Sequence, residues 1–191
     1  VITDHHEVHD ILPDAVAVVD LHRKDCNSSF KELSGVGVVL KLIIAMEGEY
    51  ADIDMLMEEY SDIAAIGTIG DIVSLTGENR VITKCGLRSI NDSDRIGVLA
   101  LLKASGCDNK ELTATDLAFS IVPRINAGGR LGLSSKSVEL LLSFDEEKAI
   151  NIASALSEDN SQRQKIEQDI LKEIDEIINR NPDIIHQQII I

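Results

Sequence analysis

The stretch AVAVVDL, residues 15–21, decides the fold, because a continuous run of β-branched and apolar residues is typical of a short buried strand. The stretch SGVGVVLKLIIAM (residues 34–46) changes to helical spacing, and IAAIG (residues 63–67) again has the composition of a buried strand. Strands separated by helices of this length predict βαβ units and a parallel sheet. The predicted fold class is therefore α/β, with DIVSL after the second strand starting another helix.

The second half of the chain is predicted to be mainly helical, with short segments around residues 89–105 and 113–121 before a much longer helix. Ser143 with Glu146 three residues later has the form of a capping box, and neither Pro nor Gly follows until Pro182. Such a helix would be roughly 55 Å long. We expect it to connect domains rather than to complete a core.

The composition is that of an ordinary globular protein, with 191 residues of which 44% are hydrophobic. Three cysteines without a C-x-x-C pair argue against a disulfide framework or a cysteine zinc site, so we expect a reduced, cytoplasmic protein. No apolar stretch reaches the ~20 residues of a membrane helix, and we expect no membrane partner. Because Val1 already starts an apparent strand, we expect an excised part of a longer protein.

The net charge of −15 restricts the partners, because an acidic surface repels phosphate backbones. Any contact with nucleic acid has to use a local basic patch or a bridging metal. Residues 117–138 contain three cations, Arg124, Arg130 and Lys136, and no acid. This segment is either such a patch or one basic loop on an ordinary acidic surface.

Two adjacent histidines follow the opening strand in VITDHH. Adjacent side chains of an extended strand point to opposite faces, so the two rings should divide their roles. One imidazole would bind a metal and the other would face substrate, with Asp4 orienting either ring. The alternative is a polar strand end whose histidines cap a helix or lie in solvent. Zinc motifs of the H-E-x-x-H and deaminase types are not matched.

Two further stretches contain candidate site residues. In IAAIGTIGDIVSL, a strand followed by a short loop would bring Asp71 to the carboxyl end of the sheet, where it can complete a site with His5. The alternative role of Asp71 is a helix N-cap. In PRINAGGRLG (residues 123–132), three glycines, two arginines and an asparagine can surround an anion, or form a plain glycine-rich turn between helices.

Taken in order, TDHH, SGVGVVLKL, GTIGDIVSLTGENR, PRINAGGRLG and a long acidic helix resemble the RecJ family of single-strand-specific 5′-to-3′ exonucleases, within the DHH phosphoesterase superfamily. The resemblance covers nearly the whole chain. It implies two-metal phosphodiester hydrolysis of single-stranded DNA with Mn²⁺ or Mg²⁺, and repair or replication proteins as candidate partners. The implied residues are His5 and Asp71 as metal ligands, His6 and Asp4 as catalytic residues, and Arg124, Asn126 and Arg130 as DNA contacts.

The resemblance also implies a domain organisation. Residues 1–77 would form the C-terminal part of a DHH domain, 78–142 a helical subdomain, 143–181 an interdomain helix, and 182–191 the start of a DHH-associated domain. The chain departs from the family at Gly128-Gly129, where the family commonly has Ala-Gly. It also lacks the upstream aspartate run, so we expect the chain alone to be nearly inactive. Another DHH phosphoesterase or a non-catalytic replication scaffold remain the alternatives.

Overall fold

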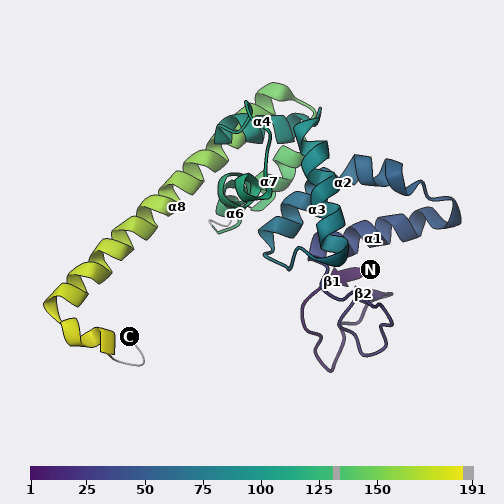
Figure 1. The fold of residues 1–191 in the computed structure, drawn as a ribbon, viewed down its shortest axis with the longest axis horizontal. Helices are drawn as coiled ribbons and strands as arrows, with labels where there is room; N and C mark the ends of the chain where they lie inside the picture. Colours follow the sequence, from purple (N-terminus) through teal and green to yellow (C-terminus); the bar gives the residue numbers. More distant parts are fainter. Residues whose placement is uncertain (131–133, 187–191) are drawn as a thin grey trace.

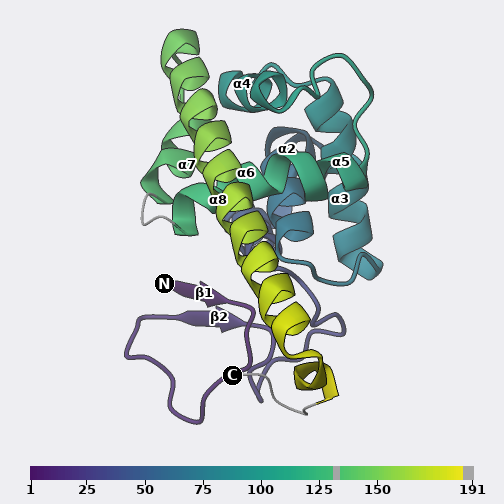
Figure 2. The ribbon, with the colours of Figure 1, turned by 90° about the vertical axis from the view of Figure 1, so that its left-hand side faces the viewer.

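The computed structural model of the chain describes residues 1–130 and 134–186, which form a mostly helical protein with one small parallel sheet (Figure 1). The strands lie at one end of a helical body, and the last long helix projects from it (Figure 2). The strand predicted for the C-terminal tail falls outside the described residues, except for His186. Within the described residues, no helix is both long and apolar enough to cross a membrane.

The sheet consists of β1 (Ile2–Asp4) and β2 (Val18–Asp20), which pair in parallel with Asp4 opposite Asp20. The predicted parallel sheet is confirmed, but residues 63–67 are not part of it. Residues 5–17, which connect the strands, contain no helix, so this pair is not a βαβ unit. Because both strands run in the same direction, each ends with an aspartate at the same edge of the sheet.

The strand predicted at residues 63–67 is wrong, because this stretch lies inside a helix. After β2 the chain forms α1 (Gly35–Glu47), η1 (Gly48–Tyr50), α2 (Ile53–Gly70) and α3 (Gly77–Asn91). Ala64, Ala65 and Ile66 are all buried, since α2 is covered on several sides. A short apolar run has the same pattern in a buried helix and a buried strand, and only the length of the element separates the two. The helix predicted to restart at Asp71 begins only at Gly77.

Residues 123–130 of PRINAGGRLG lie in a helix, so the alternative of a glycine-rich turn is wrong for this part of the stretch. The elements after α3 are α4 (Ile96–Ser105), α5 (Ala114–Asp116), the π-helical turn η2 (Leu117–Ile121), α6 (Val122–Arg130) and α7 (Ser134–Leu141). At η2 the N–H of Val122 donates to the carbonyl of Leu117. The wide turn fits Pro123, which has no N–H to donate to the preceding turn. The helical segments predicted around 89–105 and 113–121 are confirmed.

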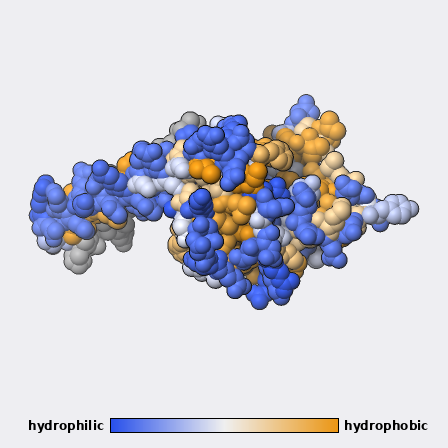
Figure 3. All heavy atoms as spheres, turned by 90° about the horizontal axis from the view of Figure 1, so that it is seen from above, coloured by the Kyte–Doolittle hydropathy of each residue, from blue (hydrophilic) through white to orange (hydrophobic). Residues whose placement is uncertain are grey.

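The long helix α8 (Glu146–Arg180) is present, and η3 (Pro182–His186) follows it. Its N-cap is Asp145, whose side chain accepts from the N–H of Lys148 at 2.9 Å, so the predicted Ser143 capping box is wrong. Ala149, Ala153 and Leu156 are buried in the core. The first half of α8 is therefore a core element, and only the second half projects, with mostly hydrophilic atoms at its surface (Figure 3).

Two hydrophobic clusters stabilise the body. The larger joins α2, α3, α4, η2, α7 and α8 around side chains such as Leu101, Leu117 and Leu156. The smaller lies between α1, α2 and α3, and includes Val38 and Ile82. Because α2 and α3 contribute to both clusters, the two helices connect the strand end of the molecule to the α8 end. The domain boundaries expected from the sequence stay a prediction.

Helices α2 and α3 approach each other closely at Gly86. A Cβ at this position would lie 2.1 Å from the carbonyl oxygen of Ser61 and 2.3 Å from Cβ of Ala65. These contacts are backbone and a short side chain, which cannot rotate away. The helix pair therefore depends on glycine at residue 86.

We predict that Gly86→Ala lowers the free energy of unfolding by about 1–3 kcal/mol, because an added methyl group forces the two helices apart. Urea denaturation followed by circular dichroism measures the change. Gly129→Ala is the matched control, because a Cβ there meets nothing within 4 Å and alanine favours the helix by about 1 kcal/mol. Equal stability of the Gly86→Ala variant and the unmodified chain would contradict the close packing.

Candidate metal centre

A hollow of about 320 Å³ opens where β1, α1, α2 and α6 meet. It is lined by His5 after β1, Gly35 in the first turn of α1, Asp71 at the end of α2, and Asn126 on α6. Residues from four parts of the sequence therefore share one small space. This is the arrangement expected of a binding site rather than of a loop surface.

His5 and Asp71 meet directly in this hollow. Nε2 of His5 lies 2.7 Å from Oδ2 of Asp71, and both side chains are partly buried. Asp71 is the C-cap of α2, with its N–H bonded to the carbonyl of Gly67 at 2.9 Å. The structure thus brings together the two residues expected to share a metal ion, although Asp71 follows a helix and not a strand.

The crossing of α1 and α2 determines where these two residues lie. Ser34 is fully buried; its Oγ accepts from the N–H of Gly37 as the N-cap of α1, and lies 2.9 Å from Oγ1 of Thr68. At Gly67 the helices are so close that a Cβ would lie 2.7 Å from Cγ1 of Val36. Fixing Thr68 against the start of α1 also fixes Asp71, three residues further along.

Space is also tight where His5 contacts α1. A Cβ on Gly35 would lie 3.1 Å from Nδ1 of His5, so the ring rests directly on the helix backbone. The N-terminus of α1 and the C-terminus of α2 therefore both lie at the hollow. The partial negative charge of the α2 terminus adds to the Asp71 carboxylate and favours a cation, whereas the α1 terminus favours an anion.

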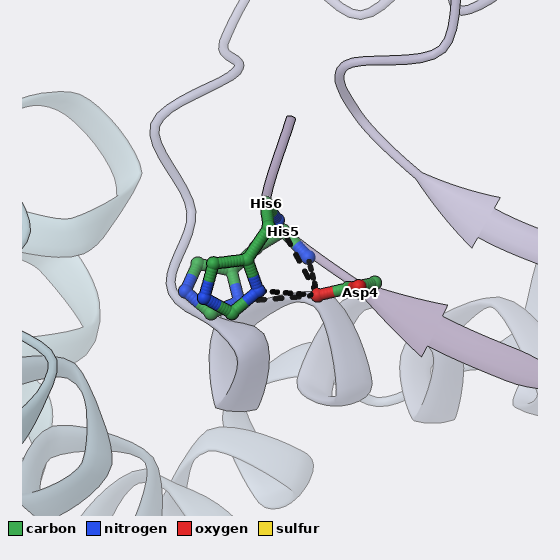
Figure 4. Close-up of side chains that lie close together, drawn as sticks. All are labelled: Asp4, His5 and His6. Carbon is green, nitrogen blue, oxygen red and sulfur yellow. Dashed lines mark hydrogen bonds and ion pairs between the residues drawn. The ribbon is translucent and has the colours of Figure 1, made fainter. Parts of the chain in front are cut away.

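Asp4 holds His6 beside His5 (Figure 4). Oδ1 of Asp4 accepts from Nδ1 of His6 at 2.8 Å and from the N–H of His5 at 2.7 Å. The hydrogen bond from the His6 ring and those from the two backbone N–H groups lower the pKa of Asp4 to about 2. In return, the hydrogen bond and charge of Asp4 raise the pKa of His6 above its ordinary value, with weaker effects of Asp71 and Asp20.

The two histidine rings do not face opposite sides, as an extended strand would require. β1 ends at Asp4, and the rings of His5 and His6 lie with their centroids 4.2 Å apart at an angle of 44° (Figure 4). The alternation rule fails here because the chain bends immediately after the strand. Both imidazoles are consequently directed to the same region.

The donor atoms suit a hard divalent cation. One ligand atom from each of Asp4, His5 and His6 lies within 4.8 Å of the others, and Asp71 adds a carboxylate next to His5. Carboxylate oxygens favour Mg²⁺ or Mn²⁺, and an imidazole shifts the preference toward Mn²⁺. The residues present therefore fit the metal that the resemblance implies.

Asp20 belongs to the same edge of the sheet and was missed by the sequence analysis. It pairs in register with Asp4, is 7% exposed, and accepts from the N–H of His22 at 2.8 Å. A signal was present, because AVAVVD repeats the pattern of VITD, a short strand ending in aspartate. Asp20 adds negative charge behind the histidines without entering the hollow.

Ile72, directly after Asp71, has a φ of +60° and is the one non-glycine residue with positive φ in the described chain. Its side chain is 90% exposed, so packing does not explain this conformation. A β-branched residue rarely adopts a positive φ, and such strain concentrates at functional sites. The strain thus marks the position where α2 ends and Asp71 turns into the hollow.

The predicted DNA-contacting residues on α6 are arranged differently from one another. Asn126 is exposed and lines the hollow. Arg124 instead donates from Nε to Oγ of Ser157 on α8 at 2.9 Å, and burial lowers the pKa of its guanidinium. The side chain of Arg130 lies outside the described part of the chain. The DNA-binding roles of all three stay predictions.

The basic patch that residues 117–138 could form is weaker than the sequence alone indicated. Lys136 lies 3.2 Å from the carboxylate of Asp159 on α8, and Arg124 is turned toward the same helix. Two of the three cations thus hold α6 and α7 against α8. The Lys136–Asp159 pair reduces the local positive charge available to a phosphate, whereas the Ser157 hydroxyl does not neutralise Arg124.

The comparisons with known proteins relate the chain to a known family. Residues 1–68 match the family model described as the DHH family, N-terminal domain. This match includes β1, β2, α1 and most of α2, and so part of the hollow, whereas Asp71 and α6 lie beyond it. The first part of the chain is accordingly related to DHH-family domains.

The particular relatives are RecJ exonucleases, and the chain is a homologue of them. It is 39% identical to the single-stranded-DNA-specific exonuclease RecJ of Bacillus subtilis over 180 residues, which cover 94% of this chain and 22% of that protein. It is 37% identical to the Escherichia coli protein of the same name, over 88% of this chain and 31% of the relative. The resemblance inferred from the motifs is confirmed. The chain spans between a fifth and a third of these relatives.

Solved structures show the same relationship in three dimensions. Exonuclease RecJ bound to manganese matches with a TM-score of 0.76 and 35% identity, over 90% of this chain and 42% of that one. RecJ from Thermus thermophilus in complex with Mn²⁺ matches with a TM-score of 0.73 and 35% identity, over 90% and 25%. The architecture described above is therefore similar to part of these RecJ structures.

We predict that Asp4→Asn lowers the pKa of His6 toward its ordinary value of 6.5 in the metal-free chain, because the carboxylate that favours the imidazolium is lost. The Asp4–His6 pair stabilises the fold mainly between the unfolded values of 3.8 and 6.5. Its contribution falls as pH rises through the raised pKa of His6, and as pH drops through the value of about 2 of Asp4.

Histidine proton shifts followed by NMR against pH measure this change. Asp10→Asn is the control, because Asp10 contacts Lys24 rather than a histidine. An unchanged His6 titration in Asp4→Asn, or an equal shift in Asp10→Asn, would contradict the pairing.

Proposed function

We propose that this chain provides part of the active site of a metal-dependent exonuclease that hydrolyses single-stranded DNA from its 5′ end. The observation that supports this most directly is the 2.7 Å contact of His5 with Asp71, between segments 66 residues apart in the sequence. Similarity to RecJ exonucleases supports a single-stranded DNA substrate. The direction of cleavage is what the family resemblance implies.

The spacing of His5 and Asp71 suits a shared cation. Two neighbouring ligands of a six-coordinate Mg²⁺ or Mn²⁺, each about 2.1 Å from the ion, lie about 3 Å apart. The observed 2.7 Å therefore needs little opening. RecJ of Thermus thermophilus has been solved with Mn²⁺ and with Mg²⁺, which supports either ion here. Bound divalent cations supply Lewis acidity to the phosphate and activate water.

The role of His6 in this proposal follows from its exposure and its partner. Its side chain is 75% exposed, so the ring can contact a phosphate bound in front of His5. Asp4 accepts from Nδ1, which leaves Nε2 directed away from the carboxylate. A raised pKa favours the protonated ring, which donates to a phosphate oxygen or to the leaving oxygen. Asp4 acts by orienting His6.

A second hollow adjoins the first and suits the bases of a single strand. It has a volume of about 530 Å³ and shares Gly70, Val122 and Asn126 with the metal site. Its wall is mostly apolar and includes Phe119, which is 78% exposed. Unpaired bases stack on exposed aromatic rings, whereas the bases of a duplex stay within their own stack. The arrangement therefore supports a single-stranded substrate.

The acidic character of the chain is compatible with a DNA substrate only if charge is balanced locally. Divalent cations at the hollow place positive charge where a phosphate enters, against a net charge of −15. We further propose that the ligand set is completed by residues that this sequence does not include, as the resemblance implies. The cytoplasmic location and the repair or replication partners stay predictions.

We predict that His5→Ala and Asp71→Ala each weaken Mn²⁺ binding to the chain by at least tenfold, because each removes one ligand atom from a small set. Electron paramagnetic resonance of free Mn²⁺ during titration measures the affinity. His9→Ala is the matched control, since His9 is an exposed histidine of the same loop and lies outside the hollow. An unchanged affinity for Mn²⁺ in both site variants would contradict the proposed metal centre.

We predict that the purified 191-residue chain degrades 5′-labelled single-stranded DNA only marginally with Mn²⁺, because the proposal places the remaining metal ligands outside this sequence. In the natural full-length protein, His6→Ala should lower kcat about 100-fold or more. Gel analysis of 5′- and 3′-labelled oligonucleotides gives both rate and direction. Robust 5′-to-3′ degradation by the isolated chain, abolished by His6→Ala, would refute the incomplete site while retaining the catalytic role of His6.

A further inference from the structure

A hollow larger than the two described above lies away from the metal centre, toward the other end of α2 and α3. It has a volume of about 790 Å³ and is bounded by the first half of α2, the end of α3, the turn into α4, and the loop between α7 and α8. We name it the α2–α8 groove. It includes no residue of the two hollows described above, so catalysis does not account for it.

Large apolar side chains stand exposed along this groove. Phe144 is 95% exposed, Leu142 is 65% exposed, and Met55 on the opposite side is 58% exposed. The chain contains only three phenylalanines, and Phe144 at the groove is one of them. A set of exposed large apolar residues around a concavity is characteristic of a protein-binding surface.

The loop that presents these side chains is held in shape before any partner arrives. The N–H of Leu142 donates to the carbonyl of Val138, and that of Ser143 to Leu140. Oγ of Ser143 then accepts from the N–H of Asp145, which itself caps α8. Binding here would order little additional backbone, which lowers its entropic cost.

The charge around the groove is acidic. Asp62 and Arg95 pair with each other at 2.8 Å and contribute no net charge. The remaining charged side chains of the groove are four acids and one cation, namely Glu58, Glu59, Asp92, Asp94 and Arg88. A neighbouring hollow shares Phe144 and adds Asp145, Glu146 and Glu147. On the face seen from above in Figure 3, patches of hydrophobic residues are bordered by hydrophilic ones.

We propose that the α2–α8 groove docks a basic segment of a partner protein, with aliphatic side chains against Phe144, Leu142 and Met55 and flanking Lys or Arg side chains against the acids. Nucleic acid and anionic lipid are repelled by the same acids. A second copy of this chain, at a net charge of −15, is repelled as well. The groove volume suits several side chains of a peptide.

The test uses a fluorescein-labelled peptide of about 16 residues of Lys and Leu, with Leu at helical spacing, and fluorescence anisotropy at about 0.15 M salt. The chain should bind it at least tenfold more tightly than the Glu/Leu peptide of the same pattern. Leu142→Ser with Phe144→Ser should weaken binding at least tenfold. The control is Ile11→Ser with Val16→Ser, which are 87% and 99% exposed outside the groove, and it should change binding less than twofold.

A charge test separates docking from general attraction to an acidic protein. Glu58→Lys with Asp94→Lys in the groove should weaken binding at least tenfold, whereas Glu173→Lys with Asp175→Lys on the projecting half of α8 should change it less than threefold. Both pairs alter the net charge equally. Similar losses in the two variants, no binding by the unmodified chain, or equal binding of the Glu/Leu peptide would each overturn the proposal.

Two further outcomes would assign the groove to another occupant and so also overturn it. Light scattering would reveal a dimer that Phe144→Ser dissociates, which would indicate a second copy. Loss of peptide binding in the natural full-length protein would indicate that another part of the same polypeptide covers the groove. None of these measurements involves nuclease activity, so the result is independent of the proposed function.

Discussion

The contact between the start of α1 and the end of α2 is the constraint on which the site depends. The buried hydroxyls of Ser34 and Thr68 meet across this contact, and Gly67 permits the approach. A buried hydroxyl without a partner is costly, so each depends on the other and neither helix can slide alone. His5 rests on α1 and Asp71 ends α2. Their separation is therefore set by helix packing and not by the loops in which they lie.

Part of this arrangement could be predicted from the sequence, because it depends on local chemistry. Short β-branched runs identified both strands of the sheet, and the uninterrupted acidic stretch identified α8. The meeting of His5 and Asp71 was also expected. The reason given for this meeting was wrong, because Asp71 was predicted to follow a strand and instead follows the helix α2. The prediction survived because a helix end and a strand end both deliver a side chain to the edge of a layer.

The failures share a physical cause, which is that tertiary contacts overrode local preference. Residues 63–67 have strand composition, yet burial on several sides suits them to a helix. The glycines and proline of PRINAGGRLG favour a turn, but Val122 and Ala127 are buried and hold α6 together. The adjacent histidines share one side because the chain bends after Asp4. No single-sequence pattern contains these long-range contacts.

The division of α8 into an embedded half and a free half has a mechanical consequence. Leu156 and Asn160 are anchored in the body, and the last described turn of the helix ends at Arg180. The roughly 20 residues of α8 after Asn160 form a lever about 30 Å long. A tilt of about 5° at the base of this lever displaces its tip by about 2.6 Å. Small rotations of the body are thus amplified at the end of α8. Conversely, a force that acts on this end exerts a torque on the embedded half of the helix.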